Sequence, residues 1–375
     1  MKAWLKWNRR RREAQMFARA MASNSHPILA QIIPIRRCNL SCTYCNEYDK
    51  VSPPVATEEM LRRLDKLRDL GTSIITFSGG EPMLHPDLDL LIRRVRENGA
   101  IVTLITNGYL LTPARIKQLN HAGLDYLQIS IDNVQPDDVS KKSLKVLDRK
   151  LEWLAQYADF DITINSVLGS GISQSEDAYQ VAVRARELGF TSTVGILHDG
   201  HGQLAPLNEE QHNVHDRILR LGTGLFSFAH HDSFQQNIAA GLPNQWHCGA
   251  GGRFLYVCEE GLVHYCSQQR GRPGIPLAEY TREDILREGA KPKGCAPFCT
   301  ISCVHQTAML DTFREKPKEA LAGIIERRQE REPGWKVPVS IRALQWAFLR
   351  DSKTRDRFGA MALKVLRVAG PRENT

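Results

Sequence analysis

The 375-residue sequence has no uninterrupted apolar run of the ~18–20 residues that a membrane-spanning helix requires. Its basic N-terminus lacks the continuous apolar stretch and small-residue cleavage site of a secretory signal. No repeat of solenoid length and no low-complexity tract is present. With 42% hydrophobic and 25% charged residues, the composition is that of a globular chain, and we expect it to be cytoplasmic.

Cysteine is missing from one long part of the chain and concentrated in two short ones. Of the nine cysteines, none lies within residues 46–247, three lie within 38–45 and six within 248–303. The reducing cytosol disfavours structural disulfides, so clustered thiols there indicate metal ligands rather than cross-links. The alternative is that they are small buried hydrophobic residues.

The net charge of +8 is spread unevenly over the sequence. Residues 1–20 and 335–370 are strongly basic, whereas the middle of the chain, 21–334, is mildly acidic. An acidic middle argues against a nucleic-acid interface on the core of the protein.

The two basic ends predict a peripheral contact with the inner face of the membrane. Trp4, Leu5 and Trp7 precede four arginines, Arg9 to Arg12, a combination typical of interfacial anchors. A second apolar face with nearby basic residues is formed by Phe358, Met361, Ala362 and Val365. The alternative is that both ends are ordinary solvated helices packed on the rest of the protein.

Short apolar runs alternate with amphipathic segments between residues 28 and about 200. The runs are Ile32–Ile35, Ser73–Phe77, Ile101–Ile105, Tyr126–Ile131, Ile162–Val167 and Thr193–Leu197. Helical periodicity is clear in 57–71 and 87–99, and Thr112-Pro113 is a typical helix start. This alternation predicts a parallel α/β sheet with helices outside, arranged as a partial or full barrel of six units.

The segments that carry chemistry follow the predicted strands. A cysteine loop follows the first strand, a glycine-rich turn the second, and Thr106-Asn107-Gly108 the third. In parallel α/β folds the functional loops lie at the carboxyl ends of the strands, so these three segments should meet.

Cys38, Cys42 and Cys45 are separated by three and then two residues. Thiolates select zinc or iron–sulfur clusters, and zinc fingers divide their cysteines between two separate knuckles. Here three lie in one loop with no fourth nearby. Three thiolates on a four-iron cluster leave one iron free to coordinate a small molecule.

This loop, with the aromatic Tyr44 before its last cysteine, resembles the signature of the radical SAM superfamily. The resemblance implies a partial (β/α)6 TIM-like barrel. It also implies a 4Fe–4S cluster that binds S-adenosylmethionine (SAM) and, on reduction, cleaves it to a 5′-deoxyadenosyl radical. The protein then binds, orients and shields that species.

Gly79, Gly80, Glu81 and Pro82 close the second predicted strand. Two glycines let the backbone approach a ligand, and a carboxylate can hold a cation. The four residues resemble the superfamily's Gly-Gly-Glu-Pro element, which implies that Glu81 holds the ammonium of SAM.

Further cofactor contacts are implied at the ends of the later strands. Ser130 and Asp132 resemble the ribose-contacting positions, although they also suit a polar strand end before a turn. Asn107 is expected at the same mouth. Asn165 and His198 end the fifth and sixth strands, and a structural role is the preferred interpretation for both.

The six later cysteines are Cys248, Cys258, Cys266, Cys295, Cys299 and Cys303. Residues 259–261 between two apolar runs indicate a hairpin turn. The pattern partly resembles the SPASM and twitch extensions of radical SAM enzymes. It implies one auxiliary 4Fe–4S cluster held by Cys248, Cys266 and two or three of the last three cysteines, with Cys258 left over. The alternative is a four-thiolate zinc site.

The predicted organisation is a basic segment (1–27), a radical SAM barrel (28–200), a connection (201–245), a small cysteine-rich domain (246–305) and a basic helical tail (306–375). Only about 27 residues precede the barrel, which we expect to lack a leader-peptide-binding domain. The predicted enzyme takes hydrogen from an unidentified peptide, lipid-linked or small-molecule substrate, and receives electrons from a flavodoxin or ferredoxin. The alternative is a non-catalytic iron–sulfur electron carrier or scaffold.

Overall fold

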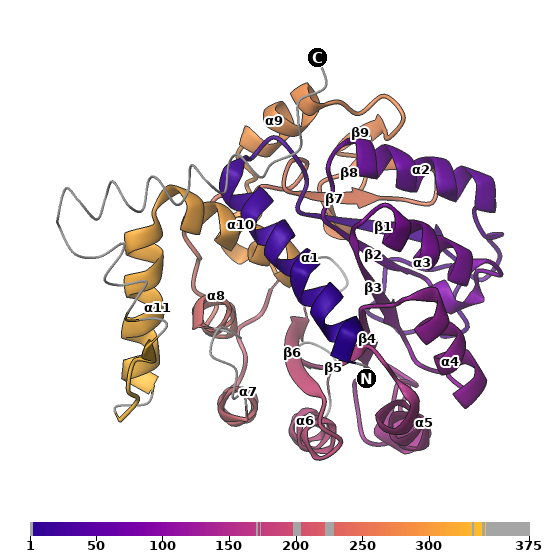
Figure 1. Cartoon of the computed structure of the whole chain (residues 1–375). Coiled ribbons are helices and arrows are strands. Elements are labelled where there is room, and N and C mark those ends of the chain that lie inside the picture. The colour runs from indigo at the N-terminus through magenta and orange to yellow at the C-terminus, as the bar shows by residue number, and fades with distance from the viewer. Residues whose placement is uncertain are drawn as a thin grey trace.

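The computed structural model describes residues 3–169, 172, 174–197, 204–221, 229–331, 334–339 and 342. One open sheet of nine strands runs through the molecule in the order β6-β5-β4-β3-β2-β1-β7-β8-β9 (Figure 1). The strands are β1 (Leu29–Ile35), β2 (Ile74–Gly79), β3 (Ile101–Thr106), β4 (Tyr126–Ser130), β5 (Asp161–Gly169), β6 (Thr191–Leu197), β7 (Phe254–Val257), β8 (Leu262–His264) and β9 (Pro273–Pro276).

Strands β1 to β6 are parallel neighbours in chain order, and each overlaps one of the six apolar runs. The predicted α/β class and partial barrel are therefore confirmed. β7 also pairs with β1 in parallel, and β8 and β9 continue the sheet in antiparallel fashion. The cysteine-rich segment thus extends the barrel's own sheet on the side of β1.

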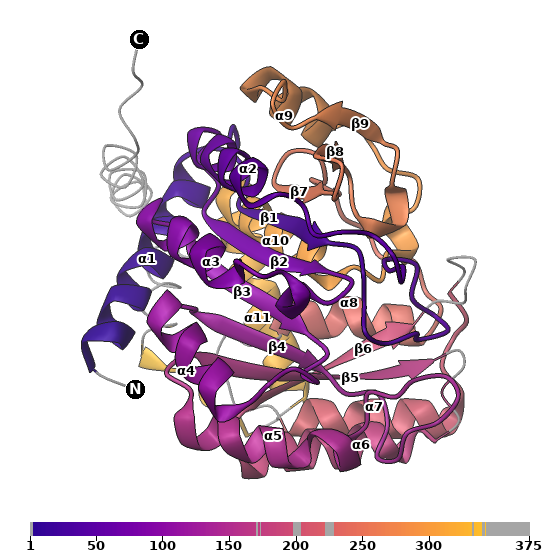
Figure 2. The same cartoon turned by 90° about the vertical axis from the view of Figure 1, so that its right-hand side faces the viewer.

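The crossover helices pack outside the sheet (Figure 2). They and the remaining helices are α1 (Ala3–Ala22), α2 (Thr57–Asp69), α3 (Leu88–Glu97), α4 (Pro113–Ala122), α5 (Leu144–Tyr157), α6 (Glu176–Glu187), α7 (Glu209–Arg220), α8 (Ala229–Ala239), α9 (Arg282–Ala290), α10 (Ser302–Glu315) and α11 (Pro317–Arg331). The Thr112 hydroxyl accepts a hydrogen bond from the N–H of Arg115, so α4 begins as predicted.

The main core fills the space between the sheet and helices α2 to α5. Buried residues such as Leu64, Leu91 and Ile116 pack there against strand residues such as Phe77 and Leu104. A second apolar cluster lies between β5, β6 and helices α6 to α8. The two clusters fix the strand ends from which the functional loops emerge.

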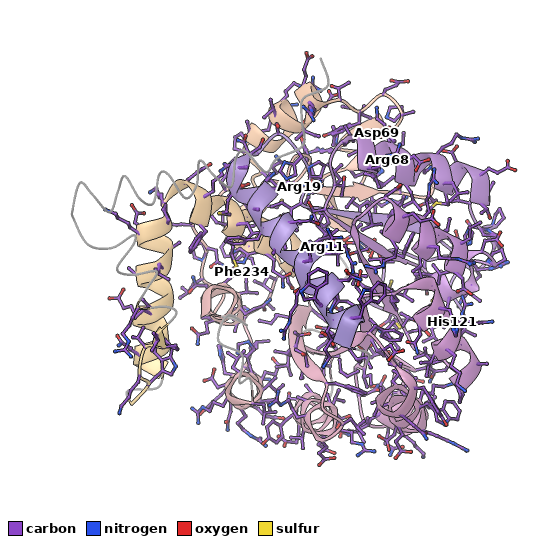
Figure 3. All side chains as sticks on the ribbon, in the orientation of Figure 1. Arg11, Arg19, Arg68, Asp69, His121 and Phe234 are labelled. Carbon is purple, nitrogen blue, oxygen red and sulfur yellow. The ribbon has the colours of Figure 1, made fainter. Side chains whose placement is uncertain are left out.

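Helix α1 crosses the amino ends of the strands, away from those loops (Figure 2). Arg12 lies 2.5 Å from a carboxylate oxygen of Asp125, and Arg9 lies 2.6 Å from Asp161. Arg9 and Arg12 are therefore buried, while Arg10 and Arg11 are exposed (Arg11 is labelled in Figure 3). Half of the arginine run closes the base of the barrel instead of facing outward.

No helix in the described part of the chain is long and apolar enough to cross a membrane. Trp4 and Trp7 on α1 are 67% and 63% exposed, as an interfacial anchor would require. The predicted apolar face from Phe358 to Val365 lies outside the described residues.

Candidate functional site

The first three cysteines lie in the loop between β1 and α2. The base of this loop is closed by two backbone hydrogen bonds, from the Cys38 N–H to Asp49 O (3.0 Å) and from the Asp49 N–H to Arg36 O (3.1 Å). Within the loop, the N–H of Cys45 donates to the carbonyl oxygen of Cys42 (3.1 Å). The backbone therefore holds the three thiols on one short closed loop.

Hydrogen-bonding groups lie near two of the three sulfur atoms. The Leu40 N–H lies 3.4 Å from Cys38 Sγ, Asn107 Nδ2 lies 3.8 Å from it, and Ser140 Oγ lies 3.5 Å from Cys42 Sγ. Burial raises the pKa of Cys45 to about 11 and also raises that of Cys38, which disfavours bare thiolates. Such thiols become stable anions when they bind metal, and the donors suit sulfur ligands.

The described residues contain no group of three side chains arranged around a single metal ion. Thiolates of a four-iron cluster bind different irons, so their sulfurs lie farther apart than the ligands of one zinc ion. Cys38, Cys42 and Cys45 lie on one loop, which suits a cluster that takes one thiolate at each of three irons.

The turn after β2 packs directly under the cysteine loop. A Cβ atom on Gly80 would lie 2.2 Å from Arg36 O and 2.3 Å from Arg37 O, so only glycine allows this approach. Gly79 has φ of +116°, which also favours glycine. Pro82 then begins a short 3-10 turn, Pro82–Leu84.

The carboxylate of Glu81 is fully buried and accepts three hydrogen bonds. Its donors are Thr106 Oγ1 (2.8 Å), the Asn107 N–H (2.8 Å) and the Met83 N–H (3.0 Å). Burial raises the pKa of Glu81, although these bonds work in the opposite direction. The residue expected to hold an ammonium thus also binds together the ends of β2 and β3.

Asn107 belongs to the same assembly. Its side-chain nitrogen donates to Asn39 Oδ1 at 2.7 Å, and Asn39 lies within the cysteine loop. Asn107 therefore links the end of β3 to the loop that carries the thiols.

Asp132, Tyr44 and Lys142 form a buried polar group beside the cysteine loop. The Tyr44 hydroxyl donates to Asp132 Oδ2 (2.5 Å), and Lys142 Nζ lies 3.0 Å from the same oxygen. Burial alone would lower the pKa of Lys142, but the Asp132 charge outweighs it and holds that pKa well above its usual value. Asp132 Oδ1 is buried without a hydrogen-bond partner.

A cavity of about 390 Å³ opens between the strand ends, the cysteine loop and residues 300–303. Four residues expected to contact the cofactor or substrate line it, namely Tyr44, Ser130, Asp132 and Asn165. Glu81 and Asn107 are not among its described lining residues, and His198 lies outside the described part of the chain. The expected residues therefore divide into those facing the cavity and those supporting the loop behind it.

The later cysteines converge from three segments of the chain. The thiols of Cys248, Cys266 and Cys295 raise the pKa of Cys299, although burial is the larger cause, so all four lie within electrostatic reach. Burial and Cys266 raise the pKa of Cys303 to about 12. Cys258 is fully buried at the end of β7. The converging thiols suit an iron–sulfur cluster or a thiolate metal site.

Residues 32–202 match the family model described as "Radical SAM superfamily". These residues are a radical SAM domain. The match begins in β1 and ends beyond β6, and it includes the cysteine loop and the Gly79–Pro82 turn.

Two curated relatives are each 32% identical to part of the chain. One is the PqqA peptide cyclase of Granulibacter bethesdensis, matched over 167 residues, 42% of this chain and 43% of the relative. The other is the AdoMet-dependent heme synthase of Methanosarcina barkeri, matched over 159 residues, 40% of this chain and 45% of the relative. The chain thus spans less than half the length of both.

A solved structure shares the fold. The crystal structure of Streptococcus suis SuiB has a TM-score of 0.50 and 17% identity, covering 65% of this chain and 61% of that chain. The similarity extends beyond the length of the radical SAM domain and supports the partial barrel.

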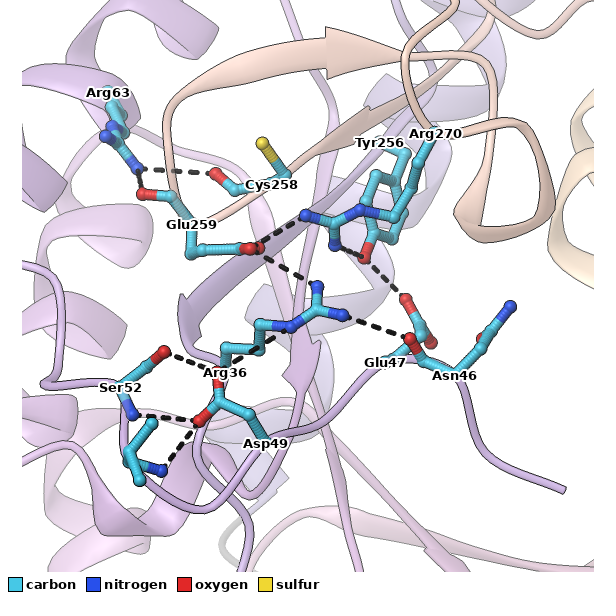
Figure 4. Close-up of polar contacts among 11 residues, drawn as sticks. Arg36, Asn46, Glu47, Asp49, Ser52, Arg63, Tyr256, Cys258, Glu259 and Arg270 are labelled. Atoms are coloured by element: carbon cyan, nitrogen blue, oxygen red, sulfur yellow. Dashed lines mark hydrogen bonds and ion pairs between the residues drawn. The ribbon is translucent and has the colours of Figure 1, made fainter. Parts of the chain in front are cut away.

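Polar contacts join the radical SAM domain to the β7–β8 hairpin (Figure 4). Glu259 Oε1 lies between two guanidinium groups, 3.2 Å from Arg36 and 2.7 Å from Arg270. Arg63 on α2 donates to the Glu259 carbonyl oxygen at 2.9 Å. The hairpin is therefore attached both to the cysteine loop and to the first crossover helix.

The same network ends on Glu47, two residues after the last cysteine of the loop. The Tyr256 hydroxyl donates to Glu47 Oε1 at 2.5 Å, and Arg270 donates to that hydroxyl at 3.3 Å. Burial raises the pKa of Glu47 against the effect of the Tyr256 hydrogen bond. Glu47 also lines the cavity.

Glu47, Lys142 and Tyr256 were not predicted as site residues from the sequence. Glu47 follows the last cysteine of the loop by two residues, but a loop carboxylate is ordinarily solvated and its sequence position gives no signal of burial. Lys142 lies in an irregular segment and Tyr256 in an apolar strand, and neither shows any local signal of its role.

Proposed function

We propose that this protein is a radical SAM enzyme that takes a hydrogen atom from a substrate bound in the cavity. The observation that carries the proposal is the closed loop of Cys38, Cys42 and Cys45 beside a cavity lined by Tyr44 and Asp132. A 4Fe–4S cluster with SAM supplies, when bound and reduced, a 5′-deoxyadenosyl radical for that step.

The chain's own residues have three tasks in this proposal. Cys38, Cys42 and Cys45 hold the cluster, while the Leu40 N–H and Asn107 donate to the sulfur of Cys38. Glu81 keeps the turn after β2 against the loop, and this turn, Gly79 to Pro82, is proposed to receive the ammonium of SAM.

The cavity residues orient the rest of the cofactor. The Ser130 hydroxyl donates to or accepts from a ribose hydroxyl, and the Asp132 carboxylate accepts from one, since its Oδ1 has free acceptor capacity. The Tyr44 hydroxyl is held by hydrogen bonds with Asp132 and Lys142, so the ring can form a rigid wall of the cavity. The enclosed space keeps water away from a reactive species.

A second 4Fe–4S cluster is proposed in the segment 246–305. The ligands are Cys248, Cys266 and two of Cys295, Cys299 and Cys303, in agreement with the convergence of these thiols. The proposed domain division places the radical SAM core at 28–200 and the auxiliary domain at 246–305.

The proposed reductant is a flavodoxin or ferredoxin, and the substrate is a peptide or a small molecule. One curated relative is a peptide cyclase and the other a heme synthase, so relatives of both substrate kinds support this range.

A contact with the membrane surface is proposed through Trp4 and Trp7, with Arg10 and Arg11 as the outward charges. Anionic vesicles should retain the protein in co-sedimentation, and a Trp4→Ala/Trp7→Ala variant should remain in the supernatant. Equal sedimentation of both proteins would contradict this contact.

The enzymatic proposal is tested by anaerobic incubation of the purified protein with dithionite and SAM. We expect 5′-deoxyadenosine from the wild type and none above background from Cys42→Ala. Ser41→Ala is the matched control, because it changes a neighbouring exposed residue and keeps all three thiols. Equal yields from the wild type and Cys42→Ala would favour the non-catalytic electron carrier.

A further inference from the structure

The cavity lies between the two groups of cysteines. Cys45 of the first loop and Cys303 on the first turn of α10 both line it. Cys248, Cys266, Cys295 and Cys299 are absent from its described lining. Cys303 is therefore the auxiliary thiol that faces the space where a substrate would bind.

The auxiliary segment contains more thiols than one cluster requires. Cys248, Cys266, Cys295 and Cys299 form a set in which Cys299 lies within electrostatic reach of the other three. The groups whose charges act on Cys303 are Cys266 and the cavity residue Glu47. Four thiolates complete the coordination of a 4Fe–4S cluster, so this set suffices without Cys303.

A buried carboxylate marks the cavity as a ligand site. Asp132 Oδ1 is buried without a partner in a side chain that is 1% exposed. Buried polar atoms without partners are costly unless a ligand or water satisfies them. Glu47, which accepts the Tyr256 hydroxyl at Oε1, lines the same cavity. Cys303 thus shares a cavity with an acceptor prepared for a polar ligand.

We propose that Cys303 is a catalytic residue that donates a hydrogen atom to a carbon radical of the substrate, and is not a cluster ligand. This inference rests on the proposed function, which creates that radical. The S–H bond of a thiol is weaker than an ordinary C–H bond, so the transfer is favourable. A reaction that leaves the oxidation state of the substrate unchanged, such as an inversion of configuration or an addition, would end with this hydrogen transfer.

The step balances in atoms and electrons. The thiol S–H bond breaks homolytically, a C–H bond forms on the substrate, and Cys303 is left as a thiyl radical. One electron, which a reduced auxiliary cluster held in part by Cys266 would supply, and one proton from solvent would restore the thiol. The electron comes ultimately from the flavodoxin, ferredoxin or dithionite that reduces the enzyme.

The first test asks whether Cys303 is a ligand. The holoenzyme is treated anaerobically with iodoacetamide, and the modified cysteines are mapped by mass spectrometry. We expect alkylation of Cys303 and protection of the cluster thiolates. We also expect Cys303→Ala to keep the wild-type iron content, about eight per chain for two clusters, whereas Cys266→Ala loses about four. Protection of Cys303, or iron loss in Cys303→Ala, would overturn the inference.

The second test measures hydrogen transfer without an identified substrate. Wild-type holoenzyme turns over SAM with dithionite in D₂O, where the Cys303 thiol carries deuterium. A 5′-deoxyadenosyl radical left without substrate should take that deuterium. We expect singly deuterated 5′-deoxyadenosine from the wild type and loss of the label in Cys303→Ala and Cys303→Ser.

Ser302→Ala is the matched control, because Ser302 lines the same wall and has no thiol. It should keep the label. Equal labelling in all variants would overturn the hydrogen-donor role while leaving the proposed function intact. Absence of 5′-deoxyadenosine from the wild type would instead contradict the proposed function, and this inference with it.

Discussion

Glu81 accepts a hydrogen bond from Thr106 Oγ1 at 2.8 Å, which joins the carboxyl ends of β2 and β3 in the interior of the protein. The same carboxylate accepts the backbone N–H of Asn107, whose side chain reaches Cys38 and Asn39. Glu81 is thus connected to the cysteine loop through one residue. These hydrogen bonds give Glu81 a structural role in addition to the cofactor contact that we propose for it.

We predict that Glu81→Gln lowers the free energy of unfolding by about 2 kcal/mol, because an amide nitrogen would face hydrogen-bond donors that now meet a carboxylate. Anaerobic urea unfolding measures the change. Glu97→Gln, at an exposed position on α3, should leave the stability unchanged. Equal stability of the two variants would show that the three hydrogen bonds to Glu81 contribute little.

Gly80→Ala should prevent assembly of the first cluster. The added Cβ would lie within 2.3 Å of two backbone carbonyl oxygens, Arg36 O and Arg37 O, which cannot move without displacing Cys38. We expect iron per chain to fall by about half in protein that retains the auxiliary cluster. The control is Gly334→Ala, where a Cβ meets nothing within 4 Å. Full iron content in Gly80→Ala would contradict the prediction.

Much of the fold could be predicted from local pattern alone. Runs such as Ile101–Ile105 are bounded by turns and coincide with strands, because a buried parallel strand needs a short apolar segment on both faces. The pairing of β7 with β1 could not be predicted. It joins Leu29 to Phe254 across a long separation, and nothing in either segment specifies the partner.

The site was predictable where chemistry requires a fixed spacing. Three thiols on one short loop lie close together whatever the rest of the fold does, so Cys38, Cys42 and Cys45 stand out in the sequence. The Glu47–Tyr256 and Asp132–Lys142 contacts arise only when distant segments meet, and each residue alone looks like an ordinary polar side chain. The four arginines of α1 show the same limit, because two of them find carboxylates on the barrel base.

Arg12→Ala should destabilise the protein by about 3 kcal/mol, since it leaves the buried Asp125 without its nearest cation. Arg96 lies 3.2 Å from Asp125 Oδ2 and still pairs with that carboxylate, so it reduces the loss of stability without removing it. Arg11→Ala, one residue earlier and exposed, should change stability by less than about 0.5 kcal/mol. Thermal unfolding of both variants is the measurement, and similar melting temperatures would contradict the burial of the α1 contacts.

His26 should make stability depend on pH. Burial, with Arg253 nearby, lowers its pKa from 6.5 to about 3, so the folded state keeps it neutral while the unfolded state protonates it below pH 6.5. Stability is therefore lost as the pH falls from 6.5 towards 3. Between pH 7 and 5.5, the wild type should lose about 1 kcal/mol more than His26→Gln, allowing for partial exposure. Parallel urea titrations at the two pH values check the difference, and identical losses would contradict it.

The ion pair of Lys142 and Asp132 should be strongly coupled, because the two side chains are only 12% and 1% exposed and the charges lie 3.0 Å apart. Lys142→Met leaves a carboxylate in the interior, and Asp132→Asn leaves an ammonium, so each should cost about 3–5 kcal/mol. The double variant leaves neither charge and should be less destabilised than the sum, by about 2 kcal/mol or more. Lys141→Met, at the exposed neighbour, is the control. Additive losses in anaerobic urea unfolding would mean that Lys142 and Asp132 find other partners, and the rigid setting proposed for Tyr44 would then lose its support.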